Sequence, residues 1–519
     1  MIACAMVAIM SHAVVAPPVD PNDIALEIAR VRELYHLTDT LGDRLWPGFD
    51  TRRIAIAIKL DGGRELLVGH RNPPEVFRKW DEGALDGVSV AIRDGYTRHL
   101  AGTIIEIGGE WTAYLSARTA GETTESWLGT ALHECFHCYQ RKFPMGGGGG
   151  IETIVVIGPP GQPESQAPAR NSARHETPPE LNPTYAALVG LESLILQAAL
   201  QASEDLESCH LGEMFVAVRH EKWRIVGDPA ARNEEQSEVA EGTAQYVQLR
   251  LYQLLAESGG IEPVSDQDPF YRGFGRARQM YETELSNLRA GGGLPADMHS
   301  WYRNGMAQCF LLDRLRPDWK LEMEKEPLSQ FRMVEEEVHP LPAEEQNLLA
   351  GAKERFGYEA LLQQQEKQIE ARLSTIRHFI AGDGLRYWIC YDRVSGRLDW
   401  QPEGPVYQVP AWLEEEIRPP APQTRIFTSR RTVWSEGMRR FRMGEFSFES
   451  AKVPVIIGNG YLEWIDREPG GPDDMQVRAE RQEGDLHYGV AVVTKGFTLV
   501  APKATIVRTP EAVEIRILP

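Results

Sequence analysis

The chain has 519 residues, of which 42% are hydrophobic and 25% are charged, a composition typical of globular proteins. Its 75 acidic residues outnumber the 55 basic residues, which gives a formal net charge of −20. A surface of this charge repels phosphate backbones, so nucleic acid is excluded as an expected partner. Six cysteines are too few for a disulfide scaffold in a chain of this length.

The first 19 residues are expected to be a signal peptide. Residues 1–16 are small and apolar and precede Pro17 and Pro18, although the usual basic residues before the apolar stretch are missing. We therefore expect a periplasmic or extracellular protein, or a cytoplasmic one if this segment is not a signal. No other segment approaches the ~20 consecutive apolar residues of a membrane span, so none is expected.

Residues 20–120 are expected to form a mixed α/β region. Apolar residues recur at helical spacing from Ile24 to Leu41. Short apolar runs bounded by glycine, proline and aspartate then predict strands at 54–58, 65–68 and 111–117.

Residues 121–380 are expected to be mostly helical. Helical patterns cover 127–141, 185–202, 213–226, 234–257, 271–289, 300–315 and 343–380. Residues 144–183 interrupt them with five consecutive glycines and a stretch rich in proline and serine. This composition is typical of a flexible surface insertion, within which 154–157 could form a short strand.

Residues 384–519 are expected to form a separate β domain, because short β-rich runs alternate there with turn residues. The expected strands are 387–391, 454–457, 489–494, 497–500 and 513–518. The predicted fold class is therefore α+β and multidomain.

The sequence His133-Glu134-Cys135-Phe136-His137 carries the strongest chemical signal. Histidines at positions i and i+4 of a helix lie on one face, one turn apart, and can bind a single Zn²⁺. The intervening Glu134 can take a proton from a water on that ion. The sequence therefore predicts His133 and His137 as zinc ligands and Glu134 as a general base.

A catalytic zinc needs a third protein ligand, and the acidic residues of 234–246 supply candidates. Glu238 and Glu241 are three residues apart on a predicted helix and so share a face. A solvated acidic face is the alternative interpretation of this pair. Gly242 argues against it, because a glycine inside a helix often marks the close approach of another helix.

These motifs resemble the gluzincins, the peptidase MA clan that includes aminopeptidase-N-like enzymes. Those enzymes carry His-Glu-x-x-His on one helix and a third zinc ligand in a Glu-Gly-x-x-x-Tyr stretch, which Glu241-Gly242-Thr243-Ala244-Gln245-Tyr246 matches. The resemblance implies a zincin-like catalytic domain with Glu241 as the third ligand. Glu238 then becomes a candidate hydrogen-bond partner of a ligating histidine.

The resemblance also implies a role for Tyr302. The family has a later Tyr-x-x-Gly, matched here by Tyr302-Arg303-Asn304-Gly305, whose tyrosine stabilises the oxyanion. The chain departs from the family in the gap of 104 residues between His137 and Glu241, against about 18, and in lacking Gly-x-Met-Glu-Asn. Aminopeptidase activity is therefore not implied.

Three hypotheses remain open from the sequence. The first is a zinc metallopeptidase that acts on a peptide or protein substrate. The second is an exported binding protein without catalysis on the same scaffold, and the third is hydrolysis of a non-peptide amide or ester. Among other residues, Glu192 is expected to pair with Arg219 or Arg224, whereas His210 and His220 are expected to be ordinary histidines.

Overall fold

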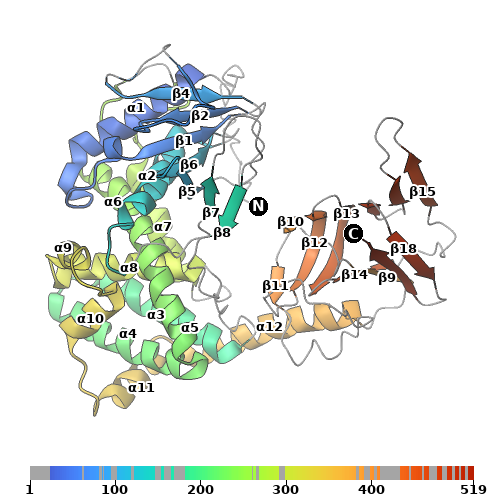
Figure 1. Ribbon diagram of the computed structural model, residues 1–519. Coiled ribbons are helices and arrows are strands. Elements are labelled where there is room, and N and C mark those ends of the chain that lie inside the picture. Colours follow the sequence, from blue (N-terminus) through green and yellow to red (C-terminus); the bar gives the residue numbers. More distant parts are fainter. Residues whose placement is uncertain are drawn as a thin grey trace, which may run out of the picture. The chain divides into compact units, whose positions relative to one another are not determined.

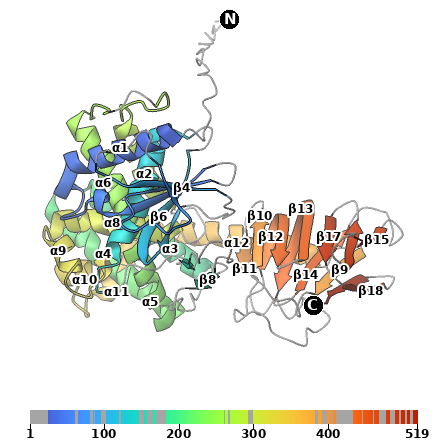
Figure 2. The same ribbon diagram turned by 45° about the horizontal axis from the view of Figure 1, so that its top comes forward.

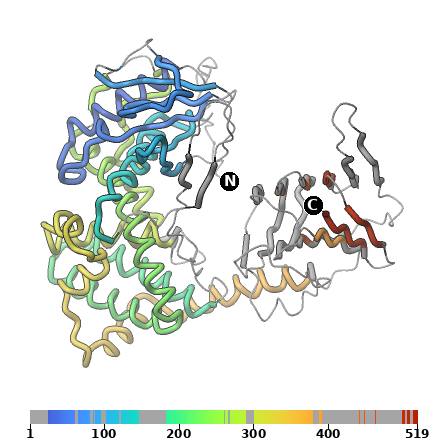
Figure 3. The backbone as a smooth tube through the Cα atoms, in the orientation of Figure 1, coloured from blue at the N-terminus to red at the C-terminus, as the bar shows by residue number. Residues whose placement is uncertain are grey.

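The computed structural model divides the chain into two compact units. The first contains residues 1–178 and 187–361, and the second contains 179–186 and 362–519. The structure describes residues 24–60, 64–80, 85, 87–94, 102–118, 122–145, 153–156, 165–168, 182–259, 261–264, 268–291, 299–380 and, from 385 to 518, the strands and residue 518. The predicted signal peptide and the five-glycine run lie outside these residues. Figure 3 traces the backbone.

An eight-stranded mixed sheet forms one side of the first unit (Figure 1). Its strands are β1 (Ala55–Lys59), β2 (Glu65–Val68), β3 (Arg78–Lys79), β4 (Val90–Arg93), β5 (Thr103–Ile107), β6 (Glu110–Ser116), β7 (Thr153–Val156) and β8 (Ser165–Pro168). Their order is β3-β4-β2-β1-β6-β5-β7-β8, with parallel pairing only for β1 with β6 and for β5 with β7. The strand predicted at 154–157 is confirmed as β7.

The sheet buries a hydrophobic cluster whose members follow the strand period of two. Ala57 of β1 pairs with Leu67 of β2 and with Tyr114 of β6, and all three side chains are buried in this cluster. Ile105 and Ile107 of β5 extend it towards the edge of the sheet. The strand register therefore places these apolar side chains side by side on one face of the sheet.

Helices make up most of the rest of the first unit. The helices among the described residues are α1 (Ile24–Leu41), α2 (Thr124–Gln140), α3 (Pro183–Gln201), α4 (Asp205–Val226), α5 (Asp228–Ser237), α6 (Thr243–Ser258), α7 (Ala277–Gly291), α8 (His299–Leu315), α9 (Trp319–Met323), α10 (Gln330–Val338), α11 (Glu345–Arg355) and α12 (Tyr358–Ile380), of which α12 lies mostly in the second unit. Helix α2 packs against β5 and β6 and also contacts α1 and α6 (Figure 2). Because of these contacts, the predicted α/β region and most of the predicted helical region lie in one compact unit.

Helix α3 is long and apolar enough to cross a membrane by length and composition, but about two thirds (67%) of its most apolar window is buried. That degree of burial is typical of a core helix. It is the only such helix among the described residues.

Two of the predicted helices are interrupted. The predicted helix 234–257 consists of α5 and α6 joined by a π-helical turn, η4 (Glu238–Gly242). The predicted helix 343–380 ends at α11 and resumes as α12, because Gly357 adopts a positive φ of 66°. The short helices α9 and α10 were not predicted from the sequence.

The second unit contains an eleven-stranded sheet. Its strands are β9 (Leu385–Cys390), β10 (Leu398–Pro402), β11 (Val406–Gln408), β12 (Val433–Met443), β13 (Phe446–Gly458), β14 (Tyr461–Asp466), β15 (Gln476–Arg481), β16 (Tyr488–Val493), β17 (Phe497–Ala501), β18 (Ala504–Arg508) and β19 (Ala512–Ile517). Among the described strands of this sheet, β19 and β9 pair in parallel and the other pairs are antiparallel. Each of the five strands predicted here overlaps an observed strand.

The turn η4 crosses helix α8 at two glycines. A Cβ atom placed on Gly242 would lie 2.5 Å from the Cα of Gly305, and one placed on Gly305 would lie 2.8 Å from the Cα of Gly242. Backbone atoms cannot move away as a flexible side chain can, so only glycine fits at either position. The close helix approach predicted from Gly242 is therefore confirmed.

Replacing Gly305 with alanine should destabilise the first unit. The added methyl group would also lie 2.9 Å from the carbonyl oxygen of Glu238, and forcing extra atoms into a packed interior costs about 1–3 kcal/mol. We expect Gly305→Ala to lower the free energy of unfolding by about that amount in urea titrations followed by circular dichroism. Gly351→Ala on α11 is the matched control, because its Cβ would meet only a methionine methyl group at 3.6 Å and alanine favours helix. Equal stability of the two variants would contradict the crossing.

Candidate metal centre

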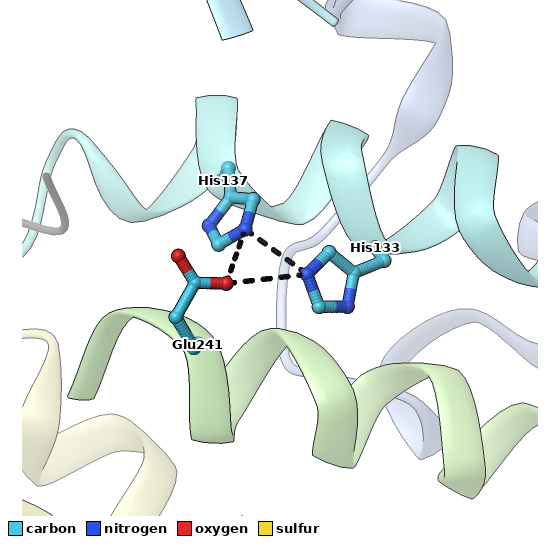
Figure 4. A group of neighbouring side chains, drawn as sticks. All are labelled: His133, His137 and Glu241. Carbon is cyan, nitrogen blue, oxygen red and sulfur yellow. Dashed lines mark hydrogen bonds and ion pairs between the residues drawn. The ribbon is translucent and has the colours of Figure 1, made fainter. Parts of the chain in front are cut away.

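The side chains of His133 and His137 on helix α2 point towards the same position. The helix starts at Thr123, whose hydroxyl accepts a hydrogen bond from the backbone N–H of Ser126 at 3.2 Å and so caps the first turn. The two imidazoles are one turn apart, and their ring centroids are separated by 4.7 Å. Their Nε2 atoms lie 3.1 Å from each other (Figure 4).

Glu241 completes the group from the opposite side (Figure 4). Its Oε2 lies 3.3 Å from Nε2 of His137 and 3.6 Å from Nε2 of His133. An ion with tetrahedral bonds of about 2.0–2.1 Å separates its ligand atoms by about 3.4 Å. The three distances of 3.1, 3.3 and 3.6 Å match this spacing, so His133, His137 and Glu241 could together hold a metal ion.

The π-helical turn η4 brings Glu241 to the histidines. Single π turns inside α-helices occur frequently at functional sites because the extra residue redirects side chains. Here the turn spans Glu238 to Gly242, and its backbone crosses α8 at Gly305. The position of Glu241 therefore depends on the close crossing of two backbones.

Gln140 connects the histidine helix to this turn, a role that was not predicted from the sequence. Its amide nitrogen donates to the carbonyl oxygen of Ala240 at 2.8 Å and to the hydroxyl of Thr243. Because a backbone carbonyl oxygen only accepts, these contacts fix the orientation of the amide. The remaining Oε1 then lies 2.8 Å from Nδ1 of His137.

This arrangement determines which nitrogen of His137 carries the proton. Oε1 of Gln140 can only accept, so Nδ1 of His137 donates to it, and Nε2 of the neutral ring keeps its lone pair for a cation. A glutamine three residues after the second histidine was the only signal available in the sequence. The role of Gln140 becomes clear only in the folded protein, where its side chain contacts the carbonyl groups of η4.

Charges within the group stabilise its ionised form. Burial alone would raise the pKa of Glu241, but the charge of His137 and hydrogen bonds with both histidines hold it well below its usual range. Burial alone would lower the pKa of His137, but Glu241, followed by the charge of Glu134 and a hydrogen bond with Gln140, raises it to about 9. Two imidazole nitrogens and a carboxylate at these distances require a proton or a cation between them.

Glu134 lies on the same helix, adjacent to His133, and is buried, with 6% of its surface exposed. Burial raises its pKa, and the neighbouring histidines only partly oppose this effect. Its Oε2 has no hydrogen-bond partner among the described residues. A buried carboxylate oxygen of this kind can accept a proton or a hydrogen bond from a bound molecule.

Tyr302 on α8 lies beside the group. Its ring stacks on that of His133 with centroids 6.0 Å apart and planes inclined by 12°. Burial, followed by the charge of Glu241 and a hydrogen bond with it, raises the pKa of Tyr302 above its ordinary value. The phenol therefore keeps its proton and remains a hydrogen-bond donor at neutral pH.

Glu238 has different partners from those predicted. Both oxygens of its carboxylate accept from Arg219, at 2.8 and 2.9 Å, and one also accepts from Gln308 at 2.9 Å. The predicted hydrogen bond from Glu238 to a ligating histidine is therefore wrong: η4 turns Glu238 away from the histidines and towards α4. The alternative of a solvated acidic face is also wrong, because Glu238 is 1% exposed.

Glu238 belongs to a buried ion cluster that runs behind the group. Arg219 also binds Glu192 at 2.7 Å, which confirms one of the two pairings predicted for Glu192. Lys222 of α4 bridges Glu192 and Glu234. The cluster thus joins α3, α4, α5 and η4 through charged side chains in the interior.

The other predicted histidines are paired separately. His210 lies 2.9 Å from Glu213, and His220 lies 2.9 Å from Glu335. Among the residues that the structure describes, His133, His137 and Glu241 are the only group of histidine, cysteine or acidic side chains spaced to hold a metal.

Comparisons with known proteins give no family for this chain: no protein-family model matches it, and neither the curated proteins nor the solved structures contain a match.

Replacing Gln140 with leucine should weaken metal binding without removing a ligand. The substitution frees the ring of His137 and releases the carbonyl groups of η4. Loss of such a partner typically lowers metal affinity about 10–100-fold, which competition with a zinc chelator would measure. Gln248→Leu is the matched control, because Gln248 lies on α6 beside α2 and its side chain bonds to Tyr252 and to none of the metal group among the described residues. Equal affinities of the two variants would refute the role of Gln140.

Proposed function

We propose that this protein is a zinc-dependent hydrolase, most closely of the gluzincin peptidase type. One observation carries the proposal: His133, His137 and Glu241 converge with the spacing of a tetrahedral ion, and Glu134 lies on the same helix. The motif order that resembles the gluzincins supports the same assignment. On this proposal the helices from α2 to α8 form a zincin-like catalytic domain in an exported, multidomain protein.

Zinc is the proposed ion because two imidazoles and one carboxylate form a known set of protein ligands for catalytic Zn²⁺. Calcium and magnesium prefer sites made of oxygen ligands, which this one is not. When bound, zinc acts as a Lewis acid that polarises the carbonyl of the substrate and lowers the pKa of a water.

Glu134 is the proposed general base. Burial raises its pKa, which makes its carboxylate a stronger base than an exposed one, and its Oε2 is available as an acceptor. It would accept the proton of the attacking water and then donate it to the nitrogen of the leaving group. This transfer leaves the carboxylate unchanged at the end of a turnover.

Tyr302 is the proposed donor to the developing oxyanion. Its phenol is protonated and lies beside His133 and Glu241. Donors of this kind, aimed at the charge that develops in the transition state, lower barriers by roughly 3–4 kcal/mol in hydrolases of other folds. The proposed substrate class is peptides or proteins, in keeping with the resemblance to peptidases.

Replacing Glu134 with glutamine should abolish hydrolysis and leave metal binding intact. The amide keeps the shape of the side chain but cannot accept a proton, and loss of a general base costs about 10²–10⁴-fold in rate. The assay is cleavage of denatured casein and of a fluorogenic peptide library by the zinc-loaded protein, with zinc content measured in parallel.

Glu125→Gln is the control for this experiment. Glu125 lies on α2 and accepts a hydrogen bond from the backbone of Arg272, which a glutamine can still accept. We expect it to keep full activity. Peptide cleavage by Glu134→Gln at the wild-type rate would contradict the proposed base, and absence of any cleavage by the zinc-loaded wild type would contradict the peptidase assignment.

A further inference from the structure

A hollow lies in the first unit, away from the metal group. Its volume is about 390 Å³, and α3, α6, α7 and α8 line it. This size lies within the range of small-molecule sites. Phe310 and Arg250 at the hollow follow Tyr302 and Glu241 by eight and nine residues, which corresponds to about 12–14 Å along the chain at the rise of a helix. It is therefore a separate site.

One wall of the hollow is apolar. Leu200 from α3, Leu285 and Leu288 from α7, and Phe310 from α8 contribute to it. The ring of Tyr281 packs edge-on against Phe310 with centroids 6.0 Å apart, so aromatic surface is also present. A ligand with an apolar chain or ring would bury that part of its surface here.

The hollow is positively charged, because the negative charge of its acidic residue, Asp313, is compensated by neighbouring side chains. Asp313 accepts from the hydroxyl of Tyr246 at 2.6 Å and from the indole of Trp319 at 3.0 Å, and it pairs with Lys320 at 3.1 Å. These partners compensate the negative charge of Asp313. Arg314 is paired in turn with Asp205.

Arg250 is a cation at this site whose charge is not compensated by a carboxylate among the described residues. Its hydrogen bonds go to neutral acceptors, the side chain of Gln253 at 2.5 Å and the carbonyl of Arg44 at 3.4 Å. Among the described residues no carboxylate lies within 4.0 Å of its guanidinium. In a protein with a net charge of −20, such an arginine beside an apolar wall marks a site for an anion.

We propose that this hollow binds a small amphipathic monocarboxylate. The carboxylate would accept hydrogen bonds from Arg250, and the apolar body would lie against Leu285, Leu288 and Phe310. A planar guanidinium matches a carboxylate through two parallel hydrogen bonds. The hollow contains none of the three residues of the metal group, so this inference does not depend on the proposed hydrolase.

Titration of the full-length protein with octanoate by isothermal calorimetry tests the site. We expect octanoate to bind at least about tenfold more tightly than octan-1-ol, which has the same chain without the charge. Arg250→Gln should reduce octanoate affinity to that of the alcohol, and Arg224→Gln, a surface substitution on α4, should not change it.

A second variant tests whether octanoate occupies the hollow itself or is only attracted by the charge of Arg250. Leu285→Trp fills the apolar side and leaves Arg250 in place, so octanoate binding should be lost while the thermal unfolding midpoint stays close to that of the wild type. The proposal is overturned if the wild type does not bind millimolar octanoate, if octanoate and octan-1-ol bind equally, or if Arg250→Gln or a folded Leu285→Trp binds as the wild type does.

Discussion

The spacing of three ligand atoms on two chain segments is the constraint on which the candidate site depends. A histidine pair one turn apart follows from helix geometry, but the carboxylate of Glu241 must reach the pair from an element 104 residues further along the chain. The structure meets this requirement with a π turn whose backbone crosses α8 at Gly242 and Gly305. Gln140 then ties that turn to His137.

The buried ion cluster contacts the π turn and helps to hold it in place. Burying charges is costly unless each is paired and hydrogen-bonded, and here Arg219 joins Glu192 to Glu238 while Lys222 joins Glu192 to Glu234. Such pairs are weak evidence for stability, but in some proteins they select one arrangement of the elements they join. We infer that the cluster fixes η4, so that Glu238 and Glu241 point to opposite sides of the turn.

The sequence predicted the helices and strands whose apolar residues recur with a clear period, and the site residues that belong to one short motif. Helix α1 and the strand β2 match their predicted bounds, and His133 and His137 are brought together as their spacing requires. The sequence could not place Glu238, because a helix of ordinary period puts Glu238 and Glu241 on one face, whereas the π turn separates them. It could not reveal Gln140 or Arg250 either, since their roles come from neighbours distant in the chain.

Whether His133, His137 and Glu241 bind a metal can be measured from the zinc content of the purified protein. The protein would be stripped with a chelator, reconstituted with one equivalent of zinc, desalted and analysed by mass spectrometry of the metal. We expect one zinc per chain for the wild type and a large loss of affinity in Glu241→Ala, because the ion would then keep only two protein ligands. A folded wild-type protein that retains no zinc, or a Glu241→Ala variant that binds zinc as tightly, would contradict it.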